Sequence, residues 1–378
     1  MSAEKRLRAE IVDQLDDVDR AVWDELAAAR SFYAGTRWLA FQRRLEENGR
    51  ALHVCVRSDD HLVAAVAVFV VDRPSSGNYD PRRLFPDAAV TDGMPVTLVG
   101  GSRGFLSAPL GGTDEHAFDL LLDAVQRIAD EHSGGLAWWL YTTSDDAAAI
   151  ANRGGVVPRL LNGECVIDLV GDGFDGYLQS LPRTRRGRVR RDLREFEVAA
   201  LTIEETRLSA GYEQCGAMLG QTQRKHGLDV SDTDMTVWLD KLCQASEDTG
   251  RVYLCRDAEG RPVGFSLIYT EGRTDYMRAV GFDYDRAPHL GEYFELTCYQ
   301  PIRAAYAQGS TALHLGSGAY HAKVRRGAQV RPLWAVPTRA GSWDPALTQE
   351  FNARKVEELL AELPGDDLVW AADSKGWL

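Results

Sequence analysis

Seven arginines fall within twelve consecutive residues, 183–194, and Asp192 is the one acidic residue among them. A guanidinium group is planar and presents its N–H donors as a fork, so it can bind two phosphate oxygens at once. We therefore expect this segment to contact the phosphates of a polyanion. The alternative is a solvated helix face whose arginines pair with acidic neighbours. The candidate phosphate-binding residues of the segment are Arg183, Arg185, Arg186, Arg188, Arg190, Arg191 and Arg194.

The net charge of the protein makes this basic segment stand out. The chain has 378 residues and a formal net charge of −13 at pH 7. Because residues 183–194 contribute +6 to that total, the rest of the chain carries −19. A compact cationic patch on an acidic protein indicates a local, oriented contact with a polyanion, and it argues against general coating of nucleic acid.

A second segment, residues 314–327, combines glycines with basic side chains. A strand-like run ends there in a small-residue turn, where glycine lets the backbone approach a ligand and expose its N–H groups. Lys323 and Arg326 would then meet a phosphate or a developing oxyanion; a structural turn with incidental basic residues is the alternative. Lys323 is thus a candidate catalytic residue, and Arg325 and Arg326 are candidate phosphate ligands. The candidate substrate-pocket residues are Gly316, Ser317, Gly318, Tyr320 and His321.

A third segment, residues 291–299, opens with a glycine at the start of an expected helix, where free N–H groups can bind anions. Glu295 is the carboxylate that we expect to act as a general base, with Tyr293 as a further catalytic candidate. The alternative is a surface glutamate next to packed aromatic rings. Outside this segment, Lys225 is a candidate phosphate ligand. Tyr299 and Arg278 complete the predicted substrate pocket.

Several kinds of site are missing from the sequence. It contains no GxSxG, HExxH, Walker A or Rossmann GxGxxG motif and no kinase signature set. The six cysteines form no CxxC pair, and no two of the eight histidines are four residues apart, so we expect no metal site. The longest apolar run, residues 62–71, is too short to span a bilayer, and the first residues lack the apolar core of a signal peptide. We therefore expect a cytoplasmic protein.

The predicted elements of the first half are helices over 4–30 and 38–48, strands over 51–57 and 61–71, a mostly irregular stretch over 73–112, a helix over 116–132, a strand over 136–142, a helix over 145–153 and a strand over 164–170. In the second half we predict helices over 177–196, 211–225 and 235–244, strands over 251–256, 263–270 and 275–281, a helix over 291–307, and strands over 312–315 and 330–336.

The order of these elements recurs, which favours two mixed α/β units in tandem over one large sheet. A glycine-rich linker over 171–176 separates them. We place the first domain at residues 1–172, the second at 173–340, and a tail at 341–378. The tail holds an amphipathic helix over 345–363, and we expect Val369, Trp370 and Trp377 to dock it on the body.

Residues 177–191 (YLQSLPRTRRGRVRR) resemble the arginine-rich helix entry of FemAB-like, GNAT-related transferases, including the peptidoglycan-biosynthesis-like group. Further similar segments follow in the same order along most of the chain: Trp23, Trp38-Leu39, residues 101–105, residues 224–227, residues 293–299 and residues 323–327. The resemblance implies an α/β protein with two tandem GNAT-like domains. Each domain would contain a mixed central sheet flanked by helices.

The resemblance also implies an activity. Characterised members transfer an aminoacyl group from aminoacyl-tRNA to an amine, whereas ordinary GNAT enzymes bind acyl-CoA through a Q/R-x-x-G-x-G/A turn. Residues 286–291 (RAPHLG) offer only one glycine for that turn. We therefore expect an aminoacyltransferase whose acceptor is an amine of a peptidoglycan precursor or small natural product, without a cofactor. The alternatives are an acyl-CoA-dependent N-acyltransferase and a non-catalytic GNAT-like binding protein.

Each basic residue has an expected role in that reaction. The arginines of residues 183–194 would contact the acceptor-stem phosphates of the tRNA. Lys323 and Arg326 would bind the 3′-terminal phosphate or the oxyanion, and Glu295 or the substrate itself would take up the proton. The expected partners are therefore an aminoacyl-tRNA and a small-molecule or peptide amine.

Overall fold

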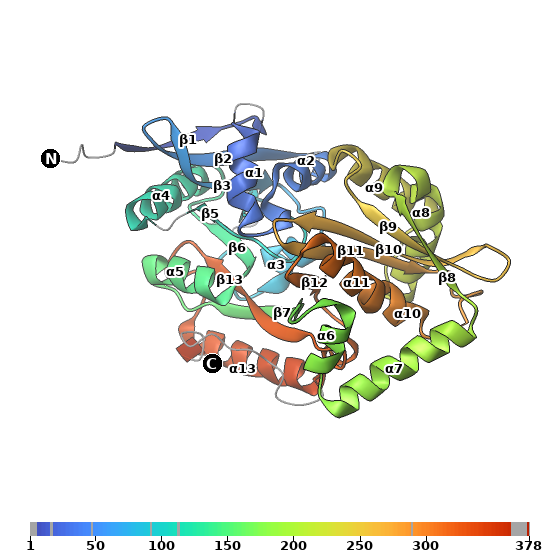
Figure 1. Ribbon diagram of the computed structural model, residues 1–378. Coiled ribbons are helices and arrows are strands. Elements are labelled where there is room, and N and C mark those ends of the chain that lie inside the picture. Colours follow the sequence, from blue (N-terminus) through green and yellow to red (C-terminus); the bar gives the residue numbers. More distant parts are fainter. Residues whose placement is uncertain are drawn as a thin grey trace. The chain divides into compact units, whose positions relative to one another are not determined.

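A computed structural model describes residues 6–15, 18–46, 48–90, 93–111, 114–288, 290–363 and 376–377 (Figure 1). The chain divides into two compact units. Unit 1 comprises Met1–Gly163 and Arg331–Leu378, and unit 2 comprises Glu164–Val330. The first segment of unit 1 thus ends at Gly163 and not at residue 172. Residues 331–340, which we assigned to the second domain, belong to unit 1.

Unit 1 contains most of the elements before residue 163 and those after residue 331. Its strands are β1 (Leu7–Val12), β2 (Gly49–Ser58), β3 (His61–Val71), β4 (Val96–Val99), β5 (Leu110–Gly111), β6 (Ala137–Thr142) and most of β13 (Gln329–Pro337). Its α-helices are α1 (Arg20–Ala28), α2 (Thr36–Leu45), α3 (Pro81–Leu84), α4 (Glu115–His132), α5 (Ser144–Gly154) and α13 (Pro345–Ala361), with short 3₁₀ turns at Phe32–Ala34 and Gly77–Tyr79.

Unit 2 carries the basic segments singled out above. Its strands are the second half of β7 (Arg159–Asp168), β8 (Thr202–Arg207), β9 (Arg251–Arg256), β10 (Pro262–Glu271), β11 (Thr274–Phe282) and β12 (Ala312–Gly316). Its helices are α6 (Gly173–Ser180), α7 (Arg183–Val198), α8 (Leu208–Lys225), α9 (Asp232–Ala245), α10 (Glu292–Phe294), the π-helix η4 (Glu295–Tyr299), α11 (Gln300–Gln308) and α12 (Tyr320–Val324).

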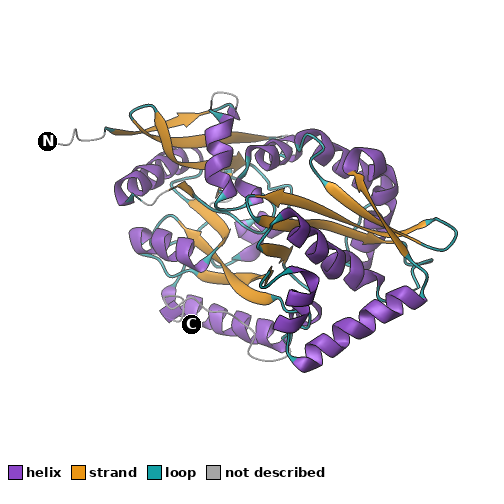
Figure 2. Ribbon diagram, viewed as in Figure 1, coloured by secondary structure: helices purple, strands orange, loops and turns teal. Residues whose placement is uncertain are grey.

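The strands of the two units follow the same order. Figure 2 shows the strands in orange and the helices in purple. In unit 1, β1 to β4 are antiparallel neighbours, β4 pairs in parallel with β6, and β6 pairs antiparallel with β13. In unit 2, β8 to β11 are antiparallel neighbours, β11 pairs in parallel with β12, and β12 pairs antiparallel with β7. The tandem repeat of one mixed α/β unit, predicted from the order of elements, is therefore visible in the strand pairing.

Two glycines show that helices cover both faces of the unit 2 sheet. A Cβ on Gly281 of β11 would lie 2.7 Å from the backbone of Met218 and Leu219 in α8. On the next strand, a Cβ on Gly264 would lie 2.9 Å from the Leu296 side chain in η4 and 2.8 Å from that of Phe282. Since residues 281 and 282 point to opposite faces of one strand, α8 and η4 lie on opposite sides of the sheet.

Four short strands were not predicted: β1, β4, the two-residue β5 and β8. β1 was expected to be helical, but its charged residues alternate with apolar ones and pair across the strands, with Arg57 Nε 2.5 Å from the Glu10 carboxylate. β8 is mostly polar and pairs with β9 along its whole length, a contact that no local pattern indicates. β4 is a four-residue buried run inside a stretch rich in glycine and proline. The expected helix over 177–196 is two helices, because Pro182 lacks an N–H group and Leu181 is extended.

The C-terminal tail contacts unit 1 through Trp377. Its ring lies edge-on to that of Trp334, 4.8 Å between centroids, and its carbonyl accepts a hydrogen bond from Asn352 Nδ2 at 2.7 Å. Val369 and Trp370 lie outside the described residues. Within the part of the chain that is described, no helix is long and apolar enough to cross a membrane. No group of three His, Cys, Asp or Glu side chains in that part is arranged to hold a metal ion.

Candidate functional site

The helix α7 carries the arginine-rich segment along the edge of unit 2 (Figure 1). Only Val189 and Asp192 of its sixteen residues are buried. Arg183, Arg190 and Arg194 are seven and four residues apart, which places them on one face of the helix, and Arg191 borders that face. They extend over roughly 16 Å, at 1.5 Å per residue. These exposed residues are Arg183, Arg190, Arg191 and Arg194, while Arg185, Arg186 and Arg188 are half-buried.

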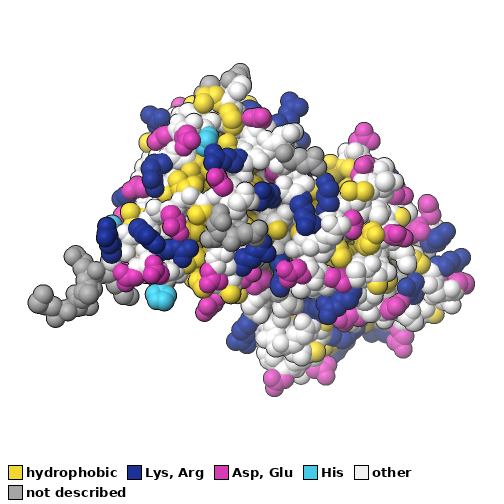
Figure 3. Space-filling view, turned by 90° about the horizontal axis from the view of Figure 1, so that it is seen from above, with side chains coloured by type: hydrophobic (Ala, Val, Ile, Leu, Met, Phe, Trp, Pro, Cys, Tyr) yellow, Lys and Arg dark blue, Asp and Glu magenta, His cyan; other side chains and the backbone are white. Residues whose placement is uncertain are grey.

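Few carboxylates neutralise this face. Arg191 Nε lies 3.5 Å from the Glu195 carboxylate, but both side chains are about half exposed, and such pairs contribute little. Arg186 donates a long hydrogen bond of 3.4 Å to the Leu181 carbonyl. Elsewhere, on the face shown in Figure 3, basic and acidic side chains are interspersed. Among the described residues, none forms an ion pair with four of the seven arginines: Arg183, Arg188, Arg190 and Arg194.

The helix is attached to unit 2 through the buried carboxylate of Asp192. It accepts hydrogen bonds from Arg326 Nη2 at 2.5 Å and from the Tyr299 hydroxyl at 2.6 Å. Arg326 Nε also donates to the Tyr299 hydroxyl at 3.2 Å, and the Arg326 carbonyl accepts a bond from the Tyr177 hydroxyl at 2.8 Å. The side chains of Asp192 and Arg326 are 4% and 2% exposed. This anchor cluster, Asp192, Tyr299, Arg326 and Tyr177, ties α7 to η4 and α12.

The anchor cluster contradicts two predictions. Arg326 was expected to bind phosphate, but its guanidinium is enclosed, pairs with Asp192 and lies over the Phe294 ring. Tyr299 was expected in the substrate pocket, but it is fully buried and its hydroxyl donates a hydrogen bond to the Asp192 carboxylate. Burial raises the pKa of Tyr299 well above its usual value, and the Asp192 carboxylate acts in the same direction against the opposing effect of Arg326. Both residues therefore hold the helix in place.

Lys323 is also hydrogen-bonded within the protein, to backbone carbonyls. Its ammonium group donates to the carbonyls of Leu315, Gly316 and Ser317 at 2.8, 3.2 and 3.1 Å. An ammonium group has three N–H donors, so all of them are used within the turn between β12 and α12. Burial lowers the pKa of Lys323. Lys323 thus folds back to hold the turn, and its ammonium group has no N–H donor left for the predicted contact with an oxyanion.

The turn itself keeps features of a binding loop. Gly316, Gly318 and Ala319 have positive φ angles of 68°, 75° and 48°, a conformation that glycine adopts without strain. A Cβ on either glycine would meet open space. The carbonyls of residues 315–317 face Lys323. The N–H groups of Ser317 and Gly318 have no partner in the part of the chain that is described. The helix α12 that follows begins with buried Tyr320 and exposed His321, and Arg325 at its end is half-buried.

Glu295 opens the π-helix η4, a local widening that follows from Pro301. Proline has no N–H to donate to the carbonyl four residues earlier, and its ring clashes with that carbonyl, so the helix widens before it. The Glu295 side chain is 4% exposed. Its Oε1 accepts two bonds from the Arg303 guanidinium, at 2.9 and 2.8 Å. Its Oε2 is buried without a partner among the described residues.

The electrostatics of Glu295 suit a proton acceptor. Burial raises the pKa of Glu295, and the Arg303 cation opposes that shift. Arg303 is held in turn over the Phe174 ring, 4.8 Å from its centroid. A carboxylate with one oxygen fixed and the other unpaired has a site where a proton can be added. The role of Glu295 as a base stays a prediction, and Arg303 is a partner of its carboxylate that the sequence did not reveal.

Two other predicted residues lie elsewhere in unit 2. The Tyr293 ring packs 5.7 Å from that of Phe282, as part of the apolar core on the α10 side of the sheet. Burial raises the pKa of Tyr293 to about 12, so its hydroxyl stays protonated. Arg278 of β11 stacks over the Trp238 ring of α9, 4.7 Å from its centroid. Neither contact is with the β12–α12 turn, so the predicted roles of Tyr293 in catalysis and of Arg278 in the pocket have no geometric support.

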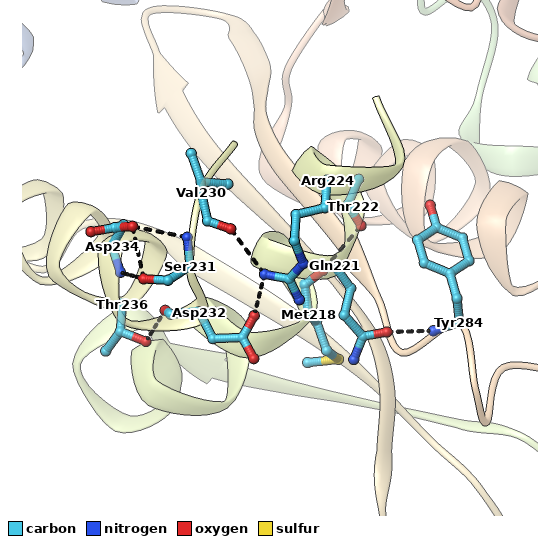
Figure 4. Close-up of polar contacts among 10 residues, drawn as sticks. All are labelled: Met218, Gln221, Thr222, Arg224, Val230, Ser231, Asp232, Asp234, Thr236 and Tyr284. Atoms are coloured by element: carbon cyan, nitrogen blue, oxygen red, sulfur yellow. Dashed lines mark hydrogen bonds and ion pairs between the residues drawn. The ribbon is translucent and has the colours of Figure 1, made fainter. Parts of the chain in front are cut away.

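Lys225 lines a shallow hollow at the end of α8, of about 400 Å³, together with Gln221, Arg224 and Tyr284. Figure 4 shows how this end of the helix is held: Gln221 accepts a bond from the Tyr284 N–H at 3.0 Å, and Arg224 reaches the Asp232 carboxylate at 2.8 Å. The Lys225 ammonium lies 3.7 Å from the centroid of the Tyr284 ring. The hollow is open to solvent and presents an exposed cation above an aromatic ring.

The start of the helix after β11 is covered by α7. A Cβ on Gly291 would lie 2.5 Å from the Asp192 carbonyl oxygen, and Gly291 has a φ of +90°. The buried Glu292 carboxylate accepts a bond from the Leu290 N–H at 2.7 Å. The expected anion site at this glycine is therefore wrong. A helix backbone and a buried carboxylate occupy the place where an acyl-CoA pyrophosphate would need free N–H groups.

Two residues that hold the candidate site together were not predicted from the sequence: Asp192 and Arg303. Asp192 is the one acidic residue in a basic segment. It lies three residues after Val189, on the helix face that packs against unit 2. That spacing was the available signal. Arg303 follows Glu295 by eight residues, and nothing local indicated that the two would meet across the π-helix.

The FemAB-like family, described as peptidoglycan biosynthesis/recognition, matches residues 14–342 of this chain. Similar solved structures include FemX, which is 11% identical with a TM-score of 0.61, over 86% of this chain and 96% of that chain. L-PGS from Bacillus licheniformis is 14% identical with a TM-score of 0.52, over 90% and 97%. A tandem GNAT protein from the clavulanic acid biosynthesis pathway is 12% identical with a TM-score of 0.50, over 88% and 99%.

No match was found among curated proteins. At such low identities the solved structures show the fold, and they confirm the predicted class of an α/β protein with tandem GNAT-like domains. The resemblance stated from residues 177–191 and the segments that accompany them is also confirmed, because the match extends over most of the sequence. This chain belongs to the FemAB-like family.

Proposed function

We propose that this protein transfers the aminoacyl group of an aminoacyl-tRNA to the amine of a peptidoglycan precursor or a small natural product. Family membership and the shared fold support a transferase role. The donor is inferred from the exposed arginine face of α7, which is the observation that carries the proposal. A row of unneutralised guanidinium groups over about 16 Å matches a phosphate backbone, in which each strand places a charge every 3.4 Å or so.

The covered start of the helix after β11 favours tRNA over acyl-CoA as donor. Gly291 packs against α7 and Glu292 is buried beside it. A pyrophosphate at this point would meet a buried carboxylate instead of free N–H groups. An enzyme that binds the phosphates of its donor with a separate helix does not need a pyrophosphate site at Gly291. The hollow at Lys225 supplies a further cation for a phosphate of either substrate.

The chemistry is aminolysis of the ester that joins the amino acid to the tRNA. The acceptor nitrogen forms a bond to the ester carbonyl carbon, the carbon–oxygen bond to the ribose breaks, and the 3′ or 2′ hydroxyl of the tRNA leaves. The nitrogen loses one proton to Glu295, whose Oε2 has no partner among the described residues, and Glu295 passes that proton to the ribose oxygen, which leaves as the hydroxyl. The N–H groups of Ser317 and Gly318 replace Lys323 as donors to the tetrahedral oxyanion. Positioning of the two substrates contributes roughly 7–11 kcal/mol in favourable cases.

A transfer assay with alternative donors tests this function. Purified protein is incubated with labelled aminoacyl-tRNAs or acyl-CoAs and a panel of amines, with and without ribonuclease. We expect amide formation from aminoacyl-tRNA that ribonuclease abolishes. Transfer from acyl-CoA alone would replace the proposal with an N-acyltransferase, and tRNA binding without transfer from any donor would indicate a non-catalytic binding protein.

A pair of variants tests the role of α7 in that assay. Arg190→Glu/Arg194→Glu reverses two exposed arginines that have no ion pair among the described residues, and we expect at least a hundredfold loss of transfer. Arg73→Glu/Arg127→Glu makes the same change of charge at exposed positions of unit 1 and serves as the matched control. Equal transfer rates for the two double variants would contradict the assignment of α7 to the donor.

A further inference from the structure

A buried hydrogen bond joins β7 to β12 just before the β12–α12 turn. His314 Nε2 donates to the Glu164 carboxylate at 3.0 Å, and the two side chains are 4% and 7% exposed. Both residues belong to unit 2, although 150 positions separate them in the sequence. Neither side chain has a part in the proposed transfer chemistry. The pair is thus a buried polar contact whose role that chemistry does not explain.

A gain in stability does not account for this pair. A carboxylate and an imidazole lose their hydration when they are buried, and one hydrogen bond recovers only part of that loss. Apolar side chains of similar volume in the same place are often equally or more stabilising. A hydrogen bond, however, fixes the distance and the direction between two groups, which apolar contact does not. The pair therefore indicates a requirement for defined geometry at this end of β12.

The strand β12 is irregular at this point. Its ladder with β7 is regular up to His314, and the next pair joins Gly316 to Cys165. Leu315 is thus the extra residue of a β-bulge, which bends the strand and changes the direction of the groups that follow. On β7, Glu164 directly precedes Cys165. The hydrogen bond from His314 to Glu164 therefore spans the bulge and holds the bend where β12 leaves the sheet.

The His314 ring is also fixed from the side of β11. The parallel ladder between β11 and β12 ends at the pair of Tyr276 and His314, whose ring centroids are 5.1 Å apart. Beyond this pair β11 continues to Phe282, where it pairs with β10. His314 is therefore the last residue of β12 that pairs with both neighbouring strands.

The turn that follows His314 carries the N–H groups that the proposed chemistry assigns to the oxyanion. Ser317 is three residues after His314, and Lys323 holds the carbonyls of residues 315–317. Because the chain between them is so short, a shift of His314 displaces the N–H groups of Ser317 and Gly318. A misplacement of about 1 Å at the reacting groups lowers a rate by about 10²-fold.

We propose that Glu164 and His314 are positioning residues for aminoacyl transfer. Their hydrogen bond fixes the bulge of β12 and so keeps the N–H groups of Ser317 and Gly318 in place for the tetrahedral oxyanion. This role rests on the proposed function. Because the two side chains bond to each other, they act through the backbone that they hold and make no contact with the substrate.

Three variants of the pair and one control test this role in the full-length protein. Glu164→Leu removes the acceptor, whereas Glu164→Gln keeps an amide oxygen that can accept the same hydrogen bond. Glu164→Leu/His314→Phe replaces the pair with apolar side chains of similar size. The control is Glu204→Leu, which removes the carboxylate that accepts a bond from Arg256 at 2.6 Å between β8 and β9, at the other end of the strand order of unit 2.

Hydrogen-exchange mass spectrometry measures whether the pair holds β12. We expect the amides of residues 312–316 to exchange at least tenfold faster in Glu164→Leu and in the double variant, relative to residues 263–270 of β10 in the same protein. Glu164→Gln and Glu204→Leu should leave that ratio unchanged. An unchanged ratio in both Glu164→Leu and the double variant would overturn the proposal.

Kinetics of transfer and thermal unfolding separate positioning from a contribution to stability. We expect kcat to fall at least tenfold in Glu164→Leu with KM unchanged for both substrates, because the oxyanion exists only after attack. Glu164→Gln should recover most of that kcat. The double variant should unfold close to the temperature of the unsubstituted protein and still have a kcat at least tenfold lower. A double variant with the kcat of the unsubstituted protein would overturn the proposal, because the pair would then serve stability alone.

The positioning role and the proposed function fail in different ways. Transfer by the unsubstituted protein with an equal kcat in Glu164→Leu would leave the proposed function standing and overturn the positioning role. Absence of transfer by the unsubstituted protein from any donor would overturn the proposed function and, with it, the role of the pair in transfer. The exchange measurement needs no substrate, so it would still show whether the pair holds β12.

Discussion

Asp192 is the residue on which the placement of the arginine helix depends. Its carboxylate receives hydrogen bonds from Arg326 and Tyr299, and no side chain of α7 other than Val189 is buried with it. Phe196, half-buried near the end of the helix, packs against the hydrophobic core of unit 2. The anchor cluster adds charge and hydrogen bonding to the attachment of α7 at Asp192.

Removal of one partner from the buried ion pair of Asp192 and Arg326 should destabilise the protein, whereas removal of both partners should be tolerated. Arg326→Met leaves a buried carboxylate unpaired, and we expect the free energy of unfolding to fall by about 3–5 kcal/mol. The double variant Asp192→Leu/Arg326→Met replaces the pair with apolar side chains and should recover most of that loss. Urea unfolding of the three proteins measures both effects. Equal stabilities for the single and double variants would show that the pair does not act as a unit.

His53 gives unit 1 a pH dependence whose sign follows from its burial. The pKa of His53 is lowered to about 4 in the folded protein from 6.5 in the unfolded chain. Between these values only the unfolded chain binds the proton, so stability is complete above about pH 6.5 and falls as the pH drops towards 4. The loss reaches about 3 kcal/mol. Unfolding free energies measured from pH 7 to pH 4.5 should therefore fall more steeply for the unsubstituted protein than for His53→Phe; parallel curves would contradict this.

At the scale of elements, the β12–α12 turn is built around one lysine. Three carbonyls converge on the Lys323 ammonium, and the backbone of the turn adopts left-handed angles at Gly316, Gly318 and Ala319. In this turn the N–H groups of Ser317 and Gly318 have no partner among the described residues. The lysine acts on the proposed chemistry through the shape of the turn.

Loss of that lysine should loosen the turn without unfolding the unit. In Lys323→Met, we expect the amides of residues 316–324 to exchange with solvent at least tenfold faster, because the three carbonyls lose their common donor. Hydrogen-exchange mass spectrometry measures this. Lys225→Met, which removes an exposed lysine at the end of α8, is the control and should leave exchange in the turn unchanged. Unchanged protection in Lys323→Met would mean that other contacts hold the turn.

Local pattern in the sequence was enough to predict many of these elements. The hairpin of β2 and β3, the helix α4 and the hairpin of β9 and β10 have clear periodicity and fall close to the predicted residues. The π-helix η4 could not be predicted, since it depends on the position of Pro301 within an otherwise regular helix. The short strand β4 has no period to read, and its pairing with β3 and β6 is set by tertiary structure.

The candidate site was predicted less well than the fold. Arg190 and Glu295 were chosen from residue type and spacing, and their roles stay predictions, because their surroundings depend on contacts made across the fold. Arg326 was taken for a phosphate ligand because its partner, Asp192, lies 134 residues earlier in the chain. Burial, which decides whether a cation is available to a ligand, is a tertiary property.

At the scale of the whole molecule, each unit completes its sheet with a strand from another part of the chain. β13 pairs with β6 of unit 1, although unit 2 intervenes in the sequence, and β7 begins in unit 1 and pairs with β12 of unit 2. Sequence order therefore suggested a boundary at residue 172, while the compact units divide the chain at Gly163 and again at Val330. The repeat of strand order was predictable, but this exchange of closing strands was not.

The net charge of the protein limits where the proposed donor, an aminoacyl-tRNA, can bind. A protein of net charge −13 repels tRNA over most of its surface, so binding has to be concentrated where positive charge is exposed. The four outward arginines of α7 set the number of phosphates that the helix can neutralise. Each such contact releases counterions, which makes the affinity fall as salt rises.

The most direct measurement is the salt dependence of aminoacyl-tRNA binding by filter retention. For four phosphate contacts, the logarithm of the association constant should fall with the logarithm of salt concentration with a slope of about −3. The slope should be shallower by at least one for Arg190→Glu/Arg194→Glu, and that variant should bind at least tenfold more weakly. Arg73→Glu/Arg127→Glu should behave as the unsubstituted protein. The same slope and affinity in all three proteins would show that α7 does not hold the tRNA.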